Sequence, residues 1–155
     1  MTAHPDTALH YALGRTLPES GQTREVALGV RWLRMRLPFA LDHINLWLLR
    51  DVQEGIEGWT AVDCGIADET TRAAWEQVFK SDLQGLPILR VLCTHMHPDH
   101  IGLAHWLCER FSSAERDCRL WISSTDWHAA RVASQSTTGL GGDNAARFFG
   151  RHGLV

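Results

Sequence analysis

The sequence contains a single lysine, Lys80, and its 18 acidic residues outnumber its 15 basic ones, which gives a formal charge of −3. Because surfaces that bind nucleic acid are normally rich in positive charge, this balance argues against nucleic acid as a partner. No apolar run approaches the roughly 20 residues of a membrane-spanning helix, and the N-terminal segment carries no signal-peptide core. We therefore expect a cytoplasmic protein without a membrane segment.

Cysteine is present, but its spacing carries no signal. The four cysteines are Cys64, Cys93, Cys108 and Cys118, without a CxxC pair or the spacing of a zinc finger. Cysteines of this kind are typically small buried thiols in a reducing compartment. At 155 residues, with 45% hydrophobic and 21% charged residues, the chain is long enough to bury a core, which excludes a disulfide-stapled miniprotein and a disordered tail.

The order of apolar patterns predicts an α/β domain over residues 23–155, after an irregular lead-in at 1–22. The patterns predict strands over 25–37, 44–49, 59–64, 88–93 and 120–122, and helices over 68–82, from 98 or 99 to 111, after 123–125 and over 143–150. The alternation changes phase near Trp32 and Leu33, which predicts a bulge or a break between two strands. A β-meander followed by helix–strand–helix–strand–helix is typical of a sheet that faces helices.

Four side chains of metal-binding types fall within six residues, at His95, His97, Asp99 and His100. His95 and His97 stand two apart at the end of a predicted strand, so their side chains leave on the same side. Asp99 and His100 follow at the turn into a helix, which folds this pair back beside the first. Such ligands suit zinc, and also iron or manganese, and two close pairs can hold two ions that share a bridging hydroxide. His105 lies farther along the helix and is expected to point elsewhere.

The segment that carries these residues resembles the signature of a known family. Thr94-His95-Met96-His97-Pro98-Asp99-His100-Ile101-Gly102 is similar to the metal-binding motif of the metallo-β-lactamase superfamily, which includes the glyoxalase II-like hydrolases. The resemblance extends to Val62-Asp63-Cys64-Gly65, similar to the family's strand-end Asp and Gly, and to Asn45-Leu46-Trp47-Leu48-Leu49, similar to its early strand. It spans residues 25–125 of this chain.

The resemblance implies a role for each residue of the motif. His95 and His97 would bind a first metal ion, and Asp99 and His100 a second, with zinc as the expected metal and Asp99 also orienting the attacking water. Asp63 would hold the motif loop by hydrogen bonds, whereas without the resemblance it reads as a turn residue at a strand end. Because the flavodiiron branch carries Glu at the position of His97, hydrolysis is favoured over reduction of oxygen or nitric oxide.

The chain departs from the family after the motif. The superfamily fold is a four-layer αββα sandwich of two similar halves, and the second half supplies another His for the first metal, a bridging carboxylate and a final His for the second metal. After His100 this chain has only His105, His128 and His152, none in the family's context. We therefore expect the first half of the sandwich, a truncated domain. Its uncovered sheet face predicts a homo-oligomer or another association through that face.

The function implied by the resemblance is that of a metal-dependent hydrolase. A metal-bound hydroxide would attack an ester, thioester or lactam carbonyl of a small-molecule substrate, and this chain would form the N-terminal part of that enzyme. Alone it is expected to be inactive or weakly active, because ligands are missing. A loop at 134–142 is a candidate for lining the substrate cleft, or else a surface connector. A phosphodiesterase or nuclease of the same superfamily and a non-catalytic metal-binding interaction module are the alternatives.

Overall fold

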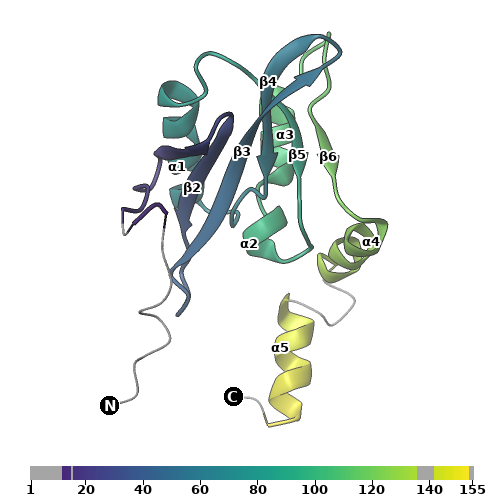
Figure 1. Ribbon diagram of the computed structural model, residues 1–155. Coiled ribbons are helices and arrows are strands. Elements are labelled where there is room, and N and C mark those ends of the chain that lie inside the picture. Colours follow the sequence, from purple (N-terminus) through teal and green to yellow (C-terminus); the bar gives the residue numbers. More distant parts are fainter. Residues whose placement is uncertain (1–11, 15, 136–141, 154–155) are drawn as a thin grey trace, which may run out of the picture.

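Six strands in one sheet and five helices make up the part of the chain that the computed structural model describes, residues 12–14, 16–135 and 142–153 (Figure 1). The strands are β1 (Thr23–Ala27), β2 (Val30–Arg36), β3 (His43–Gln53), β4 (Ile56–Val62), β5 (Ile88–Leu92) and β6 (Arg119–Trp121). The helices are α1 (Glu69–Ser81), α2 (Pro98–Ile101), α3 (Ala104–Phe111), α4 (Ser124–Ala133) and α5 (Gly142–Arg151). The predicted α/β class is confirmed. Residues 1–11 and 15 of the predicted lead-in, and 136–141 of the predicted loop, lie outside the described residues.

The sheet has the strand order β1-β2-β3-β4-β5-β6 and changes from antiparallel to parallel pairing at its middle. β1 to β4 pair antiparallel with their chain neighbours, as in the predicted meander. β5 lies parallel to β4, and β6 parallel to β5, because α1 and the α2–α3 segment carry the chain back before each next strand begins. The carboxyl ends of β4, β5 and β6 therefore meet at one edge of the sheet.

The break between the first two strands lies at Leu28 and Gly29, earlier than the phase change in the sequence suggested. Gly29 has a φ of +71°, a conformation that glycine adopts readily, and it closes the turn. Leu28, next to it, is 98% exposed. This leucine continues the alternation of apolar residues in the sequence, although its side chain lies in the turn and not on a buried face of the sheet. Trp32 and Leu33 are consecutive residues of β2 on opposite faces of the sheet. The irregular register occurs in β1 instead.

The predicted helix over 68–82 is confirmed as α1. Local sequence determines both where it begins and which of its faces is buried. The side chain of Asp68 accepts a hydrogen bond from the backbone N–H of Thr71 at 2.7 Å, as an N-cap residue does. Ala74, Trp75 and Val78 follow at helical spacing and are buried. Among the described helices, none has both the length and the apolar character that crossing a bilayer requires.

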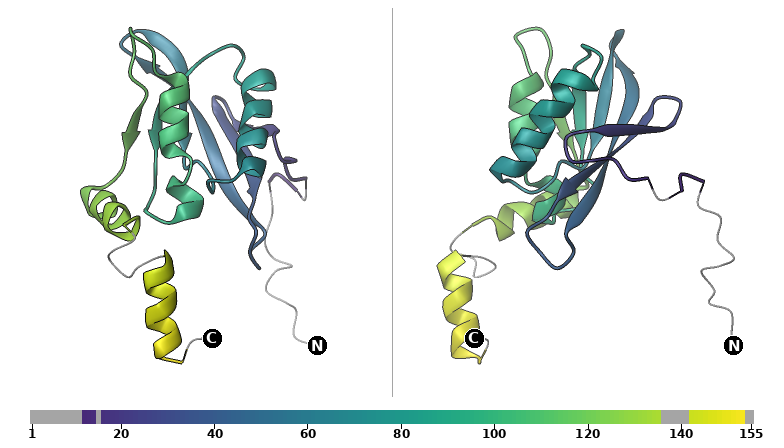
Figure 2. Two further views of the ribbon diagram at one scale, coloured as in Figure 1. Left: turned by 180° about the vertical axis from the view of Figure 1, so that it is seen from behind. Right: turned by 90° about the vertical axis from the view of Figure 1, so that its left-hand side faces the viewer.

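One face of the sheet is covered by α1 and α3 (Figure 2). The core on this side combines residues of β2 to β5 with residues of the two helices: Leu33, Met35, Ile44, Leu46, Leu48, Ala61, Trp75, Val78, Ile88, Val91 and Leu107. Two buried indoles also hydrogen-bond to backbone carbonyls, Trp75 to Cys64 at 2.8 Å and Trp59 to Leu83 at 3.1 Å. Both tryptophans therefore add apolar area to the core without leaving an unpaired donor.

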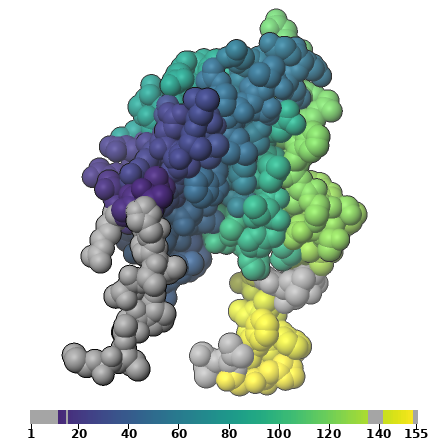
Figure 3. All heavy atoms as spheres, in the orientation of Figure 1, coloured from purple at the N-terminus to yellow at the C-terminus, as the bar shows by residue number. Residues whose placement is uncertain are grey.

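The opposite face of the sheet carries a row of apolar side chains that crosses five strands. The register aligns Trp32 of β2, Trp47 of β3, Val62 of β4, Leu92 of β5 and Trp121 of β6 as successive partners. The first three are half-buried, and Leu92 and Trp121 are exposed. In Figure 3 this face turns toward the viewer with no described helix in front of the strands. We call this set the apolar row.

Association through the apolar row stays a prediction, and its physical basis is that contiguous apolar surface favours contact over hydration. Size-exclusion chromatography with light scattering is expected to show a mass above that of one chain, rising with protein concentration. Replacing Trp121 by Thr removes the most exposed indole of the row and should shift the mass toward the monomer. A clean monomer at high concentration for the unmodified chain would contradict the prediction.

Candidate metal centre

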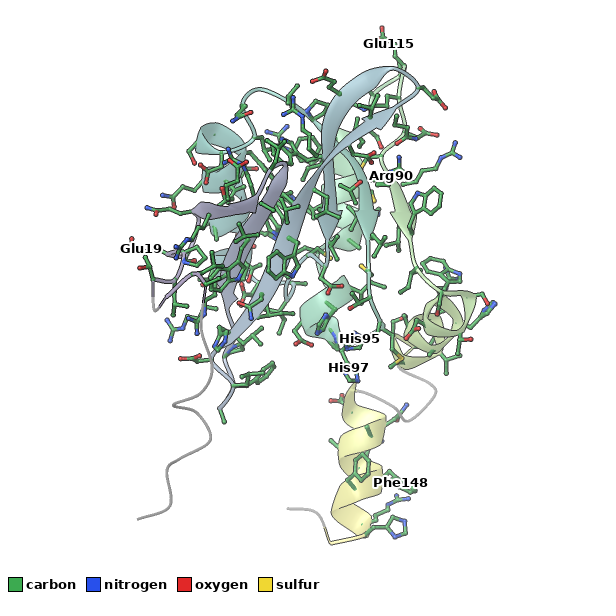
Figure 4. The ribbon with its side chains drawn as sticks, viewed as in Figure 1. Glu19, Arg90, His95, His97, Glu115 and Phe148 are labelled. Carbon is green, nitrogen blue, oxygen red and sulfur yellow. The ribbon has the colours of Figure 1, made fainter. Side chains whose placement is uncertain are left out.

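The four predicted ligands lie where the loop after β5 enters α2, at the carboxyl edge of the parallel strands. Figure 4 shows His95 and His97 at this end of the sheet, beside α2. β4 ends at the same edge, and its last residue is followed directly by Asp63, whose backbone N–H donates to the carbonyl of Leu92 at 2.8 Å. This edge of an open α/β sheet is where ligand sites typically form.

Asp63 holds the loop between Thr94 and His100 by hydrogen bonds. Its carboxylate accepts hydrogen bonds from the backbone N–H of Thr94 at 2.8 Å, from the Thr94 hydroxyl at 2.9 Å and from Nδ1 of His100 at 2.9 Å. The side chain is only 7% exposed, and the residue has a φ of +59°, which Asp tolerates better than most residues. A left-handed residue at the end of β4 thus aims its carboxylate at both ends of the ligand loop.

The structure brings all four predicted ligands together. His95 Nε2 lies 3.0 Å from His97 Nδ1, and the ring centroids of His95 and His100 are 3.9 Å apart. Asp99 Oδ2 lies 3.6 Å from His100 Nε2. His105, which the sequence set aside, has a side chain that is 86% exposed and pairs with Glu109 on the same helix. It takes no part in the cluster.

The hydrogen bonds decide which ring nitrogens are free to bind an ion. The single proton of the Thr94 hydroxyl is directed at Asp63, so the Thr94 oxygen accepts from Nδ1–H of His95 at 3.0 Å. His100 donates its own Nδ1–H to Asp63. Both imidazoles therefore keep a lone pair on Nε2; that of His95 accepts the Nδ1–H of His97 at 3.0 Å, and this proton would leave when a metal ion binds between the two rings. A protonated Nδ1 held by an oxygen acceptor is the arrangement that typically orients histidine ligands of metal ions.

The spacing within each of the two atom pairs is close to that of two ligands of one metal ion. Two ligands of a tetrahedral zinc ion lie about 3.3 Å apart, given zinc–nitrogen distances of about 2.0–2.1 Å. The His95–His97 pair at 3.0 Å and the His100–Asp99 pair at 3.6 Å lie on either side of this value. Within the described ranges, no group of three or more His, Cys, Asp or Glu side chains is placed to hold one metal ion together. Each ion would thus have two ligands here, fewer than the three of a catalytic zinc site.

A second carboxylate that the sequence did not single out holds the loop from the other side. Asp126, in the first turn of α4, accepts the backbone N–H of Met96 at 3.2 Å. Its own orientation is fixed by Ser123, whose hydroxyl donates to Asp126 Oδ2 at 2.6 Å and accepts the Asp126 N–H at 3.0 Å. A Ser followed three residues later by an acidic residue resembles a capping box, which is a signal readable in the sequence. What the sequence could not show is that the spare oxygen reaches Met96.

The helix predicted to continue from 98 to 111 is interrupted, because Gly102 and Leu103 turn toward the loop after β4. The N–H of Leu103 donates to the carbonyl of Gly65 at 3.3 Å, and the carbonyl of His100 accepts the N–H of Cys64 at 2.9 Å. A Cβ on Gly102 would lie 2.4 Å from the Pro98 carbonyl oxygen, 2.7 Å from the backbone nitrogen of Ala67 and 2.8 Å from the Gly65 carbonyl oxygen. Only glycine allows this approach, so α2 and α3 form separate helices.

Replacing Gly102 by Ala should therefore destabilise the protein by about 1–3 kcal/mol, because backbone has to move to admit the methyl group. The free energy of unfolding in urea, followed by circular dichroism, measures the change. Gly150→Ala is the matched control, since a Cβ there meets nothing within 4 Å and the residue is helical. The control is expected to be neutral or slightly stabilising. Equal effects of the two substitutions would contradict the close contact at Gly102.

Comparison with known proteins gives the family. A family profile described as metallo-beta-lactamase superfamily matches residues 40–135, which include the whole ligand cluster. The chain belongs to this superfamily. Its recognition from the sequence motif is confirmed, and with it the expected metallo-β-lactamase type of α/β fold.

Solved structures agree with the assignment. A beta-lactamase domain protein from Burkholderia ambifaria is 53% identical, with a TM-score of 0.77, over 93% of this chain and 42% of that one. A metallo-beta-lactamase family protein from Thermus thermophilus is 23% identical, with a TM-score of 0.60, over 83% of this chain and 40% of that one. A metallo-beta-lactamase from Pontibacter korlensis has a TM-score of 0.54 at 18% identity, over 75% and 49%. This chain spans less than half the length of each.

Proposed function

We propose that this chain supplies the first half of the active site of a metal-dependent hydrolase that acts on an ester, thioester or lactam carbonyl. The observation that carries the proposal is the pairing of ligand atoms, His95 with His97 at 3.0 Å and His100 with Asp99 at 3.6 Å. Superfamily membership supports a metal-dependent hydrolase-like fold. Zinc is the metal we propose for the complete site, as two ions, because imidazole and carboxylate ligands suit it, and iron or manganese would accept the same ligands.

The chain's own residues have distinct tasks in this proposal. A zinc ion in such a site lowers the pKa of a bound water toward about 7 and polarises a substrate carbonyl. His95 Nε2 and His97 Nδ1 would bind from one side of the centre, and His100 Nε2 and the Asp99 carboxylate from the other. The Asp99 carboxylate, one quarter exposed, can also accept a proton or a hydrogen bond from the attacking water. Asp63 keeps Nδ1 of His100 protonated and so keeps Nε2 directed at the site.

We propose that the chain alone is inactive or weakly active. Two ligands per ion bind more weakly than the three or four of a complete zinc site. Further ligands have to come from outside the described cluster, and this chain spans 42% of the length of the Burkholderia ambifaria protein. The whole protein, in this proposal, takes a small-molecule substrate.

We further propose that the protein works in the cytoplasm and without nucleic acid. All four cysteines are free thiols, which suits a reducing compartment. The excess of acidic over basic residues is unfavourable for phosphate backbones.

The ligand assignment is tested by comparing the chain with the double variant His95→Ala plus His97→Ala. We expect zinc bound per chain, measured by elemental analysis after gel filtration, to fall strongly in the double variant, because one whole ligand pair is removed. His105→Ala is the matched control and should retain the zinc content of the unmodified chain. Equal zinc content in all three proteins would refute the assignment.

The same proteins test the reaction class. Zinc-dependent hydrolysis of p-nitrophenyl acetate is expected to be slow in the unmodified chain and lost in the double variant. Faster turnover of bis-p-nitrophenyl phosphate would favour a phosphodiesterase instead. Zinc binding with no hydrolysis, in this chain and in a protein of the relatives' full length, would favour an interaction module. Rapid esterase turnover by this chain alone would contradict the proposed need for further ligands.

The role of Asp63 is tested by Asp63→Asn. Asn tolerates the left-handed backbone and still accepts the Thr94 N–H, but it lacks the second carboxylate oxygen that receives the His100 proton. We expect zinc affinity, measured by competition with a chelator, to fall roughly 10- to 100-fold, the usual effect of losing such an orienting partner. Nitrogen chemical shifts of the imidazole rings should show His100 losing its fixed tautomer. An unchanged affinity with an unchanged His100 spectrum would count against the role.

A further inference from the structure

A pocket of about 390 Å³ lies between α2 and α4, which stand side by side at the ligand end of the sheet (Figure 1). Its apolar wall includes Met96 from the ligand loop, Ile101 from α2, and Trp127 and Ala130 from α4. Arg131, the next residue of α4, also lines it. These five side chains are not among the predicted metal ligands, so the proposed metal chemistry does not use the pocket.

The two sides of the pocket are held in place by contacts that need no occupant. Asp126 of α4 accepts the backbone N–H of Met96 at 3.2 Å, and the Ser123 hydroxyl donates to the same carboxylate at 2.6 Å. On the other side, Gly102 lets α2 pack on the backbone of residues 65–67. The pocket is therefore preformed, as sites for small molecules usually are.

The size and the lining of the pocket suit a short hydrocarbon chain. Pockets for small molecules usually have volumes of about 300–1,000 Å³, so this one is near the lower limit. Met96 has a flexible thioether side chain that adapts to the shape of an occupant. The Trp127 ring is 41% exposed and Ile101 is half-buried, so both have apolar surface that an occupant would remove from water.

Arg131 adds one positive charge to this apolar lining. Its guanidinium carbon lies 5.6 Å from the centroid of the Trp127 ring, which is a cation–π contact. Among the residues that the structure describes, no Asp or Glu side chain forms an ion pair with Arg131. A guanidinium group binds a carboxylate through two parallel hydrogen bonds. The group that best complements this pocket is therefore a hydrocarbon chain that ends in one carboxylate.

We propose that this pocket binds a medium-chain aliphatic carboxylate, with its hydrocarbon chain between α2 and α4 and its carboxylate on Arg131. The chain packs against Met96, Ile101 and the Trp127 ring, which together line the pocket. The carboxylate stays at the rim, where Arg131 is exposed to solvent, so binding does not require the burial of an unpaired charge.

The pocket adjoins the ligand loop without including a ligand. Met96 and Pro98, which both line it, stand directly before and after His97 in the chain. An occupant therefore contacts the loop on the side of α4 and uses no atom that we assign to a metal ion. This binding does not depend on the proposed hydrolase function, and it can be tested on the metal-free chain.

The test titrates the metal-free chain with octanoate and follows the nuclear magnetic resonance signals of the Met96 methyl group and the Trp127 indole. We expect saturable shifts of both signals, while the methyl group of Met35, buried in the core, stays unchanged. Affinity should rise roughly tenfold from butanoate to hexanoate and again to octanoate, because each pair of CH₂ groups adds buried apolar area. Octan-1-ol has the same chain without the carboxylate and should bind several-fold more weakly than octanoate.

Two substitutions separate the apolar part of the pocket from its charge. Ala130→Phe fills the pocket and should abolish the binding of both octanoate and octan-1-ol. His128→Phe places the same ring at an exposed position of the same helix, outside the pocket lining, and should bind both probes like the unmodified chain. Arg131→Gln should lower the affinity for octanoate to that for octan-1-ol and leave the affinity for octan-1-ol unchanged.

Several results would overturn the proposal. They are the absence of saturable octanoate binding at millimolar concentrations, equal affinity of the unmodified chain for octanoate and octan-1-ol, and shifts centred on Trp121 of the apolar row in place of Trp127. Unchanged octanoate affinity in Arg131→Gln would refute the assigned position of the carboxylate. Loss of the zinc assignment at His95 and His97 would leave all of these expectations standing, so the two proposals fail separately.

Discussion

The loop that carries the predicted metal ligands is held in place by one buried carboxylate, that of Asp63. Asp63 accepts hydrogen bonds from the backbone and the hydroxyl of Thr94 and from the ring of His100, and these bonds join the end of β4 to both ends of the ligand loop. Hydrogen bonds to an ionised acceptor are stronger than neutral ones, and here they are shielded from water. They also choose the tautomer of His100 and, through Thr94, that of His95. The same interaction therefore serves folding and ligand orientation.

Around this carboxylate the loop is held by contacts of other kinds. Asp126 takes the N–H of Met96 from the side of α4, while Gly102 lets α2 pack directly on the backbone of residues 65–67. Backbone groups that would otherwise be unpaired in a tight loop are thereby satisfied. His95 and His97 contribute little to the packing of the fold, because His95 is half-buried, His97 is exposed, and their contacts are with Thr94, His100 and one another. A ligand set held by its surroundings is preorganised for an ion.

Much of this could be read from the sequence, and what could not be read depended on contacts between distant residues. The helix after Asp68, the strand at 88–92 and the cluster of four predicted ligands are encoded locally, by caps, apolar runs and spacing, and the motif identified the superfamily. The turn at Gly29 was misplaced because the exposed Leu28 continues an apolar alternation. The split at Gly102 and the reach of Asp126 to Met96 depend on how helices pack against loops far away in the chain, which no local pattern records.

The apolar row has a consequence for which insertions and deletions this gene can accept. The register that aligns Val62 with Leu92 also sets Asp63 beside the loop that follows β5. A one-residue insertion within β5 would send Leu92, the member of the row on this strand, to the core face, and it would also displace Thr94 from Asp63. Length changes in the connection from 82 to 87 leave that alignment untouched. Over evolution, indels should therefore accumulate in the connections and be purged from β4 and β5.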